Sequence, residues 1–148
     1  LGGVMARELA KTYPKYVRQV ISMGSPFGGN PRANHAWRIY QGVTGQEIDP
    51  KSMSDVFLNL AEAPKGIPTT AIYSKSDGVV AWQTCVEKPS PLTDNIEVYA
   101  SHCGLGVNAT VFFALADRLA LPDREWQPFD RNAAMWRRMV YPSSGHRH

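Results

Sequence analysis

Short apolar segments alternate with helical patterns along this chain, and this alternation limits the possible folds more than any other feature. The segment 17–23 is apolar enough to form a buried strand, and strand-type residues return at 69–73 and at 96–99. A helical repeat over 108–121 follows, with Asn108 as a suitable N-cap. Strands that alternate with helices are typical of a parallel sheet covered on its faces. The sequence therefore predicts an α/β fold.

The first residues have the pattern of the second half of a Gly-x-Ser-x-Gly nucleophile elbow. In that motif a serine stands on a sharp strand-to-helix turn, which small neighbours allow. Leu1 would follow the serine directly, and Gly2 would be the second glycine. Leu1, Met5 and Leu9 fall at four-residue steps, so we expect a helix with this apolar face against the sheet. The helix should end before Pro14. An ordinary helix start led by glycine explains the same residues.

Composition and charge exclude several classes of protein. The chain has 148 residues, 43% of them hydrophobic and 20% charged, as expected for one soluble globular domain or a large part of one. The net charge of +3 is spread out, and the only local basic run is Arg137-Arg138, so we expect no nucleic-acid partner. No apolar run has the length of a transmembrane segment, and no signal peptide is visible. Because the chain starts without Met, we expect its true N-terminus upstream, which leaves the compartment open.

The region between the first two predicted strands has a different character. Two short helical stretches, around 36–42 and 53–62, predict a helical insertion over about 30–65. Its apolar side chains include Trp37, Phe57 and Leu60. They would either form a wall for an acyl chain or simply pack the insertion on the core.

The C-terminal region is rich in Trp, Arg and Pro. We assign residues 1–130 to one domain and residues 131–148 to a polar, basic tail. The aromatic side chains of Trp126, Phe129 and Trp136 suggest that part of this region packs back on the domain.

Two polar loops follow the second and third predicted strands. Asp77 lies in the loop 74–80, and His102 lies in the loop 100–104. A histidine takes a proton from a hydroxyl effectively when an acceptor holds its other ring nitrogen, which is the role of a carboxylate. The carboxyl ends of parallel strands meet at one edge of a sheet, so we expect Asp77 and His102 to lie close together.

Each of these residues also has a simpler explanation. Asp77 precedes a glycine, as in many turns, and His102 could hydrogen-bond a loop carbonyl. The order elbow, acid, histidine favours the catalytic interpretation, because it is the order of the α/β-hydrolase triad. The rival carboxylates do not directly follow a predicted strand; they are Asp49, Asp55 and Asp94.

Most of the chain, from Leu1 to about Phe129, resembles bacterial α/β-hydrolases of the lipase and esterase type, with features of the GPI inositol-deacylase-like branch. The segments that carry this resemblance are 1–10, 23–29, 76–80 and 101–108. The resemblance implies the C-terminal portion of an α/β-hydrolase fold, with parallel strands, flanking helices and a helical lid or cap over about 30–65. It implies that Asp77 is the acid, that His102 is the general base and that the backbone N–H of Leu1 is one oxyanion-hole donor.

The resemblance also implies what the chain lacks. The nucleophilic serine, the other oxyanion donor and the first five strands of the usual eight would lie upstream, so we expect this chain alone to be inactive. Within it, Ser25 and Ser101 are the alternative nucleophiles, and Ser25 is a poor one because it precedes a proline and lacks a second glycine at the elbow spacing.

The expected activity is hydrolysis of a carboxylic ester, from a small-molecule or lipid substrate, without a cofactor. An acyltransferase would use the same triad and differ only in whether water or an alcohol attacks the acyl-enzyme. A non-catalytic, truncated hydrolase that serves as a binding module is the alternative from another class. An unpaired edge of the strand at 17–23 would then invite pairing with another chain, including a second copy.

The two cysteines lie near the predicted catalytic loops. A disulfide between Cys85 and Cys103 would tie the acid loop to the histidine loop, and we favour this bridge slightly over two free thiols. A metal site is not expected, because these cysteines and His102 lack the close paired spacing of a zinc site.

Overall fold

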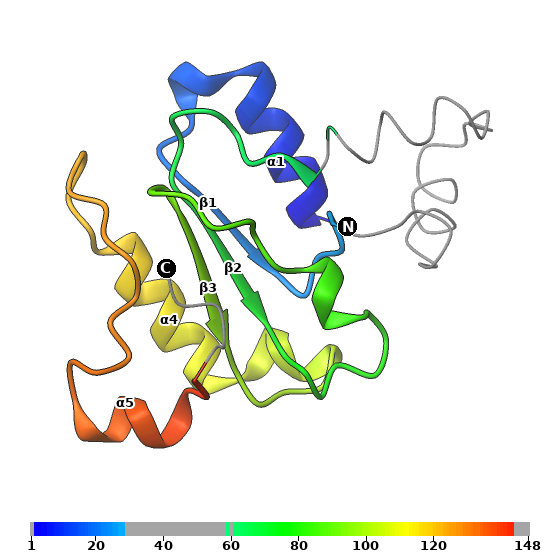
Figure 1. Cartoon of the computed structure of the whole chain (residues 1–148), viewed down its shortest axis with the longest axis vertical. Helices are drawn as coiled ribbons and strands as arrows, with labels where there is room; N and C mark the ends of the chain where they lie inside the picture. Colours follow the sequence, from blue (N-terminus) through cyan, green and yellow to red (C-terminus); the bar gives the residue numbers. More distant parts are fainter. Residues whose placement is uncertain (1, 29–58, 60, 144–148) are drawn as a thin grey trace.

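A three-stranded parallel sheet forms the centre of the computed structural model, which describes residues 2–28, 59 and 61–143. The strands are β1 (Val20–Met23), β2 (Thr69–Tyr73) and β3 (Thr93–Glu97), in the spatial order β1-β2-β3. The three arrows point the same way in Figure 1. The predicted α/β class is therefore confirmed at the level of a parallel sheet with flanking helices.

The strand boundaries agree with the sequence prediction only for β2. β1 begins three residues later than expected, because the short 3-10 helix η1 (Pro14–Tyr16) and its C-cap Val17 come first. β3 spans 93–97 rather than 96–99. The first residues of β3 are polar, so hydrophobicity does not reveal where the strand begins. The strand begins at Thr93 because this residue already pairs with Thr69 of β2.

The two long helices cover opposite faces of the sheet. Helix α1 (Gly2–Thr12) buries Ala10 in a cluster with Val20 of β1. Helix α4 (Ala109–Leu119) buries Val111 against Ile72 of β2 and Ile96 of β3. In the register of the sheet, Val20 pairs with Thr69, and Thr69 lies an odd number of residues from Ile72. Because alternate side chains of a strand point to opposite faces, Val20 and Ile72 face opposite sides of the sheet. The sheet therefore lies between α1 on one face and α4 on the other.

The helix α1 was correctly predicted, but the face that it buries was not. Met5 and Leu9 are each 55% exposed, whereas Arg7 and Ala10 are fully buried. Small residues explain the difference, since they let the helix approach the sheet closely. A Cβ atom at Gly3 would lie only 2.3 Å from Ser25 Oγ, beyond the end of β1.

Arg7 is the unusual residue of this interface, because a charged side chain takes the place of a core residue. Its guanidinium forms an ion pair with Glu87, which is also buried. It lies 3.9 Å from the centroid of the Phe27 ring and donates to the carbonyl of Ala61 at 3.3 Å. Burial raises the pKa of Glu87, and the positive charge of Arg7 opposes that rise. Arg7 thus fixes α1 to two segments that lie far away in sequence.

The C-terminal region packs back on α4, as expected for two of its three aromatic residues. Phe129 and Trp136 both contact the ring of Phe113 on α4. Trp136 belongs to a further helix, α5 (Met135–Val140). Tyr141 follows this helix, is only 2% exposed and donates to the carbonyl of Thr110 at 2.6 Å. Residues beyond 130 therefore complete the hydrophobic core.

Of the predicted insertion at about 30–65, the structure describes only residues 59 and 61–65. Leu1, Trp37, Phe57 and Leu60 lie outside the described residues. None of the helices in the described ranges is long and apolar enough to cross a membrane.

Candidate active site

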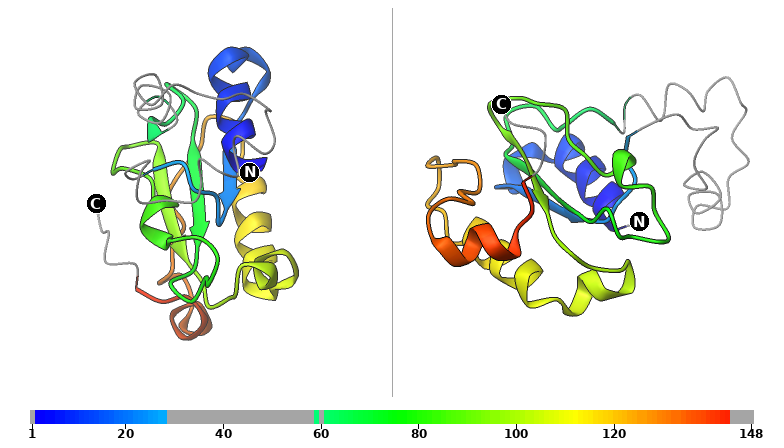
Figure 2. Two further views of the ribbon diagram at one scale, coloured as in Figure 1. Left: turned by 90° about the vertical axis from the view of Figure 1, so that its right-hand side faces the viewer. Right: turned by 60° about the horizontal axis from the view of Figure 1, so that its bottom comes forward.

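The loops that follow β2 and β3 lie at the same edge of the sheet, where the strands end. Figure 1 shows this edge at the bottom, and the right-hand view of Figure 2 brings it forward. A hydrogen bond joins the two loops directly, because the backbone N–H of Ala100 donates to Ser74 Oγ at 3.2 Å. Ser74 Oγ also accepts from the N–H of Ser76 at 3.1 Å. One buried hydroxyl thus fixes the acid loop relative to the histidine loop.

Asp77 is held in place by its own loop. Its Oδ1 accepts hydrogen bonds from the backbone N–H groups of Val79 and Val80, both at 2.9 Å. This arrangement is an Asx-type turn, which short polar side chains form readily. It leaves the second oxygen, Oδ2, free to face the neighbouring loop.

His102 lies at the start of the 3-10 helix η4 (Cys103–Val107). Its carbonyl accepts from the N–H of Leu105 at 3.3 Å, and Leu105 is buried in the hydrophobic core. The next turn is tightened by Ser101 Oγ, which accepts from the N–H of Gly104 at 3.1 Å. The backbone that carries the imidazole is therefore anchored on both sides.

The two predicted residues meet in a direct hydrogen bond. Nδ1 of His102 lies 2.7 Å from Oδ2 of Asp77. The Asp77 side chain is 3% exposed, whereas that of His102 is 35% exposed. The sequence prediction that the two residues lie close together is thus met, and the acid is shielded from water while the imidazole reaches the surface.

The charge state of Asp77 follows from these contacts. Burial acts to raise its pKa, but hydrogen bonds from Val80, His102 and Val79 outweigh burial, and the pKa is lowered from its ordinary value of 3.8. Asp77 is therefore an ionised acceptor at neutral pH, and the proton between the pair is assigned to Nδ1 of His102. This tautomer leaves the lone pair on Nε2, where a base needs it.

The described residues contain no hydroxyl that hydrogen-bonds Nε2 of His102. Ser25 is 4% exposed, and its Oγ donates to the carbonyl of Met23 at 3.3 Å. Ser101 caps the turn after His102. Both serines are thus engaged in local hydrogen bonds.

The rival carboxylate Asp94 has a structural role. Its Oδ2 accepts from the N–H of Phe129 at 2.7 Å, and its Oδ1 accepts from the N–H of Asn95 at 2.9 Å. Asp94 therefore attaches the C-terminal segment to β3. The other two rivals, Asp49 and Asp55, lie outside the described residues.

The predicted disulfide between Cys85 and Cys103 is not formed, and this prediction was wrong. Both are free thiols, Cys85 buried and Cys103 exposed. Cys85 packs with Tyr73 and Val80, and burial raises the pKa of its thiol to about 11. The spacing in the sequence placed both cysteines near the site. It carried no information about where each side chain points, and one thiol is buried while the other is exposed. Among the described residues, no group of three or more His, Cys, Asp or Glu side chains could hold a metal ion.

Sequence reasoning missed two residues of the site. Ser74 joins the two loops that carry Asp77 and His102, and Gly24 lies against both of these side chains. Gly24 directly follows β1, and a Cβ atom there would lie 3.2 Å from Asp77 Oδ2. The rule that located Asp77 and His102 also covers these residues, because each stands just after a strand at the same edge. Their small size made them look like ordinary turn residues.

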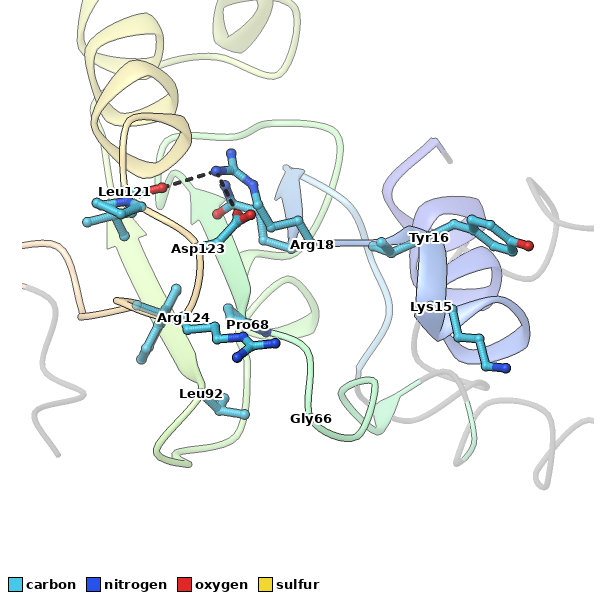
Figure 3. A pocket seen from close by; sticks show the side chains of 13 residues that line it. Lys15, Tyr16, Arg18, Gly66, Pro68, Leu92, Leu121, Asp123 and Arg124 are labelled. Atoms are coloured by element: carbon cyan, nitrogen blue, oxygen red, sulfur yellow. Dashed lines mark hydrogen bonds and ion pairs between the residues drawn. The ribbon is translucent and has the colours of Figure 1, made fainter.

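Two cavities lie at the other edge of the sheet, where the strands begin. One of about 520 Å³ is lined by residues that precede each strand, among them Arg18, Pro68 and Leu92 (Figure 3). Arg18 closes one side by donating to the carbonyl of Leu121 at 3.0 Å. The other cavity, of about 510 Å³, is lined by segments 61–67 and 87–93. Neither is lined by Asp77 or His102, so neither belongs to this site.

Comparisons with known protein families, curated proteins and solved structures found no match for this chain. The assignment of a function therefore depends on the geometry of the site and on the sequence patterns.

Proposed function

We propose that this chain supplies the acid and the general base of a carboxylic-ester hydrolase of the lipase and esterase type. Asp77 is the acid and His102 is the base in this proposal. The observation that carries it is the 2.7 Å hydrogen bond between an ionised, shielded carboxylate and a partly exposed imidazole. In the proposal the nucleophile is a serine that precedes Leu1 directly, outside the 148 residues.

The proposed reaction has two halves. The serine oxygen attacks the ester carbonyl carbon while Nε2 of His102 takes the hydroxyl proton. The tetrahedral oxyanion accepts hydrogen bonds from the N–H of Leu1 and from a donor outside this chain. Its collapse breaks the bond to the alcohol, which leaves with the proton from Nε2. A water molecule then gives a proton to Nε2 and attacks the acyl carbon. Collapse of this second intermediate breaks the bond to the serine oxygen, which takes the proton back from Nε2, and the carboxylic acid is released. Asp77 stays ionised throughout.

The packing of α1 supports a serine in that position. The first turn of α1 touches the chain at the end of β1, because Gly3 lies against Ser22 and Ser25. Gly24, between those two serines, lies against Asp77 and His102. The start of α1 therefore lies near the edge that carries the acid and the base. This is the place that the elbow motif requires.

The proposal includes the absence of activity from the chain by itself. In a serine protease, loss of the nucleophile costs about 10⁶-fold in kcat, and loss of an oxyanion donor costs about 10²- to 10³-fold. The pair of Asp77 and His102 cannot replace either group.

The proposed substrate is a small-molecule or lipid ester with an apolar acid portion. This part of the proposal depends on the apolar side chains of Trp37, Phe57 and Leu60 and on the lid that the resemblance implies over about 30–65. Hydrolysis and transfer of the acyl group to an alcohol both fit the pair of Asp77 and His102, since they share the acyl-enzyme.

A second candidate function, a non-catalytic binding module, is favoured by a different observation. Met5 and Leu9 on α1 and Tyr13 directly after it are apolar residues at four-residue steps, each more than half exposed. In the described part of the chain, β1 also pairs on one side only. Both features suit contact with another polypeptide. Both features would equally suit contact with the upstream half of a hydrolase. A measurement of ester hydrolysis is therefore needed to distinguish the enzyme from the binding module.

The test is hydrolysis of short- and long-chain p-nitrophenyl esters by the polypeptide that includes the residues upstream of Leu1. We expect hydrolysis that disappears when the serine before Leu1 is replaced by Ala or when His102 is replaced by Gln. An added alcohol that raises product release would indicate acyl transfer. Upstream residues without Gly-x-Ser, or a polypeptide with no ester hydrolysis, would support the binding module instead.

A further inference from the structure

Gly24 lies against the hydrogen bond between the proposed acid and base. A Cβ atom at this position would lie 3.2 Å from Oδ2 of Asp77 and 3.4 Å from Nδ1 of His102, which are the two atoms of that bond. The residue is buried and directly follows β1. Its N–H donates to the carbonyl of Ile72 at 2.9 Å, so the backbone of Gly24 is fixed to β2.

The space around Gly24 is also closed on a further side. The same Cβ atom would lie 2.7 Å from Cδ1 of Leu105, a distance that real side chains do not reach. Leu105 cannot easily retreat, because it is 3% exposed and belongs to the core cluster with Ile72 and Ile96. Gly24 has a φ of +52°, which glycine adopts without the strain that a side chain would cause. The segments that follow β1, β2 and β3 thus meet in one closely packed group, made of Gly24, Asp77, His102 and Leu105.

We infer that Gly24 is a positioning residue, whose missing side chain keeps Asp77 and His102 in the hydrogen-bonded geometry that the base requires. In this inference Gly24 acts through the pair of Asp77 and His102. An added methyl group would press on Leu105, the carboxylate and the imidazole, and Leu105 is the one held by the core. Displacement of the His102 ring or of the Asp77 carboxylate lengthens the hydrogen bond between them, which sets the tautomer of His102. The catalytic consequence rests on the proposed function, whereas the effect on the pair does not.

Gly66 provides a matched control for the backbone. Its φ is +73°, but nothing lies within 4 Å of a Cβ atom built there. The variants Gly24→Ala and Gly66→Ala therefore carry a similar conformational cost, and only the first introduces contacts with the pair. Both should lose some stability, because alanine is strained at a positive φ.

The test is NMR spectroscopy of the 148-residue chain, with the His102 ring assigned by comparison with His102→Gln. We expect Gly24→Ala to lose the downfield Nδ1–H resonance of His102 and to raise the pKa of Asp77 toward its ordinary value of 3.8. Gly66→Ala should keep the resonance and the lowered pKa. A second pair of variants, Leu105→Ala and Gly24→Ala/Leu105→Ala, removes the closest clash and keeps the test valid if Gly24→Ala alone does not fold. The double variant should still lose the resonance, and Leu105→Ala should keep it.

A wild-type Nδ1–H resonance in Gly24→Ala or in the folded double variant would overturn the inference. Loss of the resonance to the same extent in Gly66→Ala would overturn it too.

In the polypeptide with the upstream serine, we expect Gly24→Ala to lower kcat about 10²-fold, with little change in KM. If the NMR changes occur but the wild-type polypeptide has no serine-dependent activity, the proposed function fails while the positioning of the pair by Gly24 stands.

Discussion

At the scale of single residues, the geometry of Asp77 explains why a carboxylate serves better here than a neutral side chain. Two backbone N–H groups and the imidazole of His102 all donate to it. These donors favour the ionised form more than burial disfavours it, and so the pKa of Asp77 is lowered. The carboxylate is thereby both fixed and charged at the pH at which an imidazole acts as a base.

The lowered pKa of Asp77 predicts how the stability of the protein depends on pH. In the unfolded chain the carboxyl has its ordinary pKa of 3.8. Its stabilising contribution is therefore fully present above that value and is lost as the pH falls through the lower pKa of the folded state. Urea unfolding of wild type and Asp77→Asn should show a stability difference that is steady near pH 5 and shrinks toward pH 2. A difference that stays constant down to pH 2 would contradict this assignment.

A second prediction at this scale concerns the cap of α4. Asn108 Oδ1 accepts from the N–H of Thr110 at 2.8 Å, as a helix N-cap should. Asn108→Ala should lower the free energy of unfolding by about 1 kcal/mol, whereas Asn108→Asp keeps the acceptor and should cost less. Thermal or urea unfolding measures both. Equal losses in the two variants would show that the side-chain acceptor is not what stabilises the helix start.

At the scale of elements, α1 illustrates what a periodic pattern can and cannot predict. Its existence and its end follow from the spacing of Met5 and Leu9 and from Pro14. Its buried face does not follow, because periodicity favours the larger apolar side chains. The structure buries Ala10 and Arg7 instead. The reason lies far away in sequence, since the ion pair with Glu87 and the contacts with Phe27 and Ala61 compensate the burial of the guanidinium.

The ion pair between Arg7 and Glu87 therefore predicts a large effect of a small change. Arg7→Met should lower the free energy of unfolding by about 3–5 kcal/mol, because it leaves the buried carboxylate without its cation. The double variant Arg7→Met/Glu87→Met should recover most of that loss, since it leaves no buried charge unpaired. Urea unfolding of the three proteins at neutral pH measures both effects. A single variant as stable as wild type would contradict the structural role of the pair.

At the scale of the whole molecule, the parallel sheet is the reason that part of the site could be predicted. Asp77 and His102 are 25 residues apart, yet both follow strands, and parallel strands end at one edge. That rule needs only the order of the elements. The cysteine bridge needed the directions of two side chains, which spacing does not contain, and it was predicted wrongly. Gly24 was missed because its importance is a close approach that exists only in three dimensions.

The central claim is that Asp77 and His102 activate a serine contributed from outside these 148 residues. Labelling with a fluorophosphonate probe tests it most directly. The polypeptide with the residues upstream of Leu1 should be labelled on the serine before Leu1, and Asp77→Asn should slow the reaction by up to about 10⁴-fold, the effect of the same change in a serine protease. The 148-residue chain should not be labelled. Labelling of that chain itself, or labelling of the longer polypeptide that is unaffected by His102→Gln, would contradict the account.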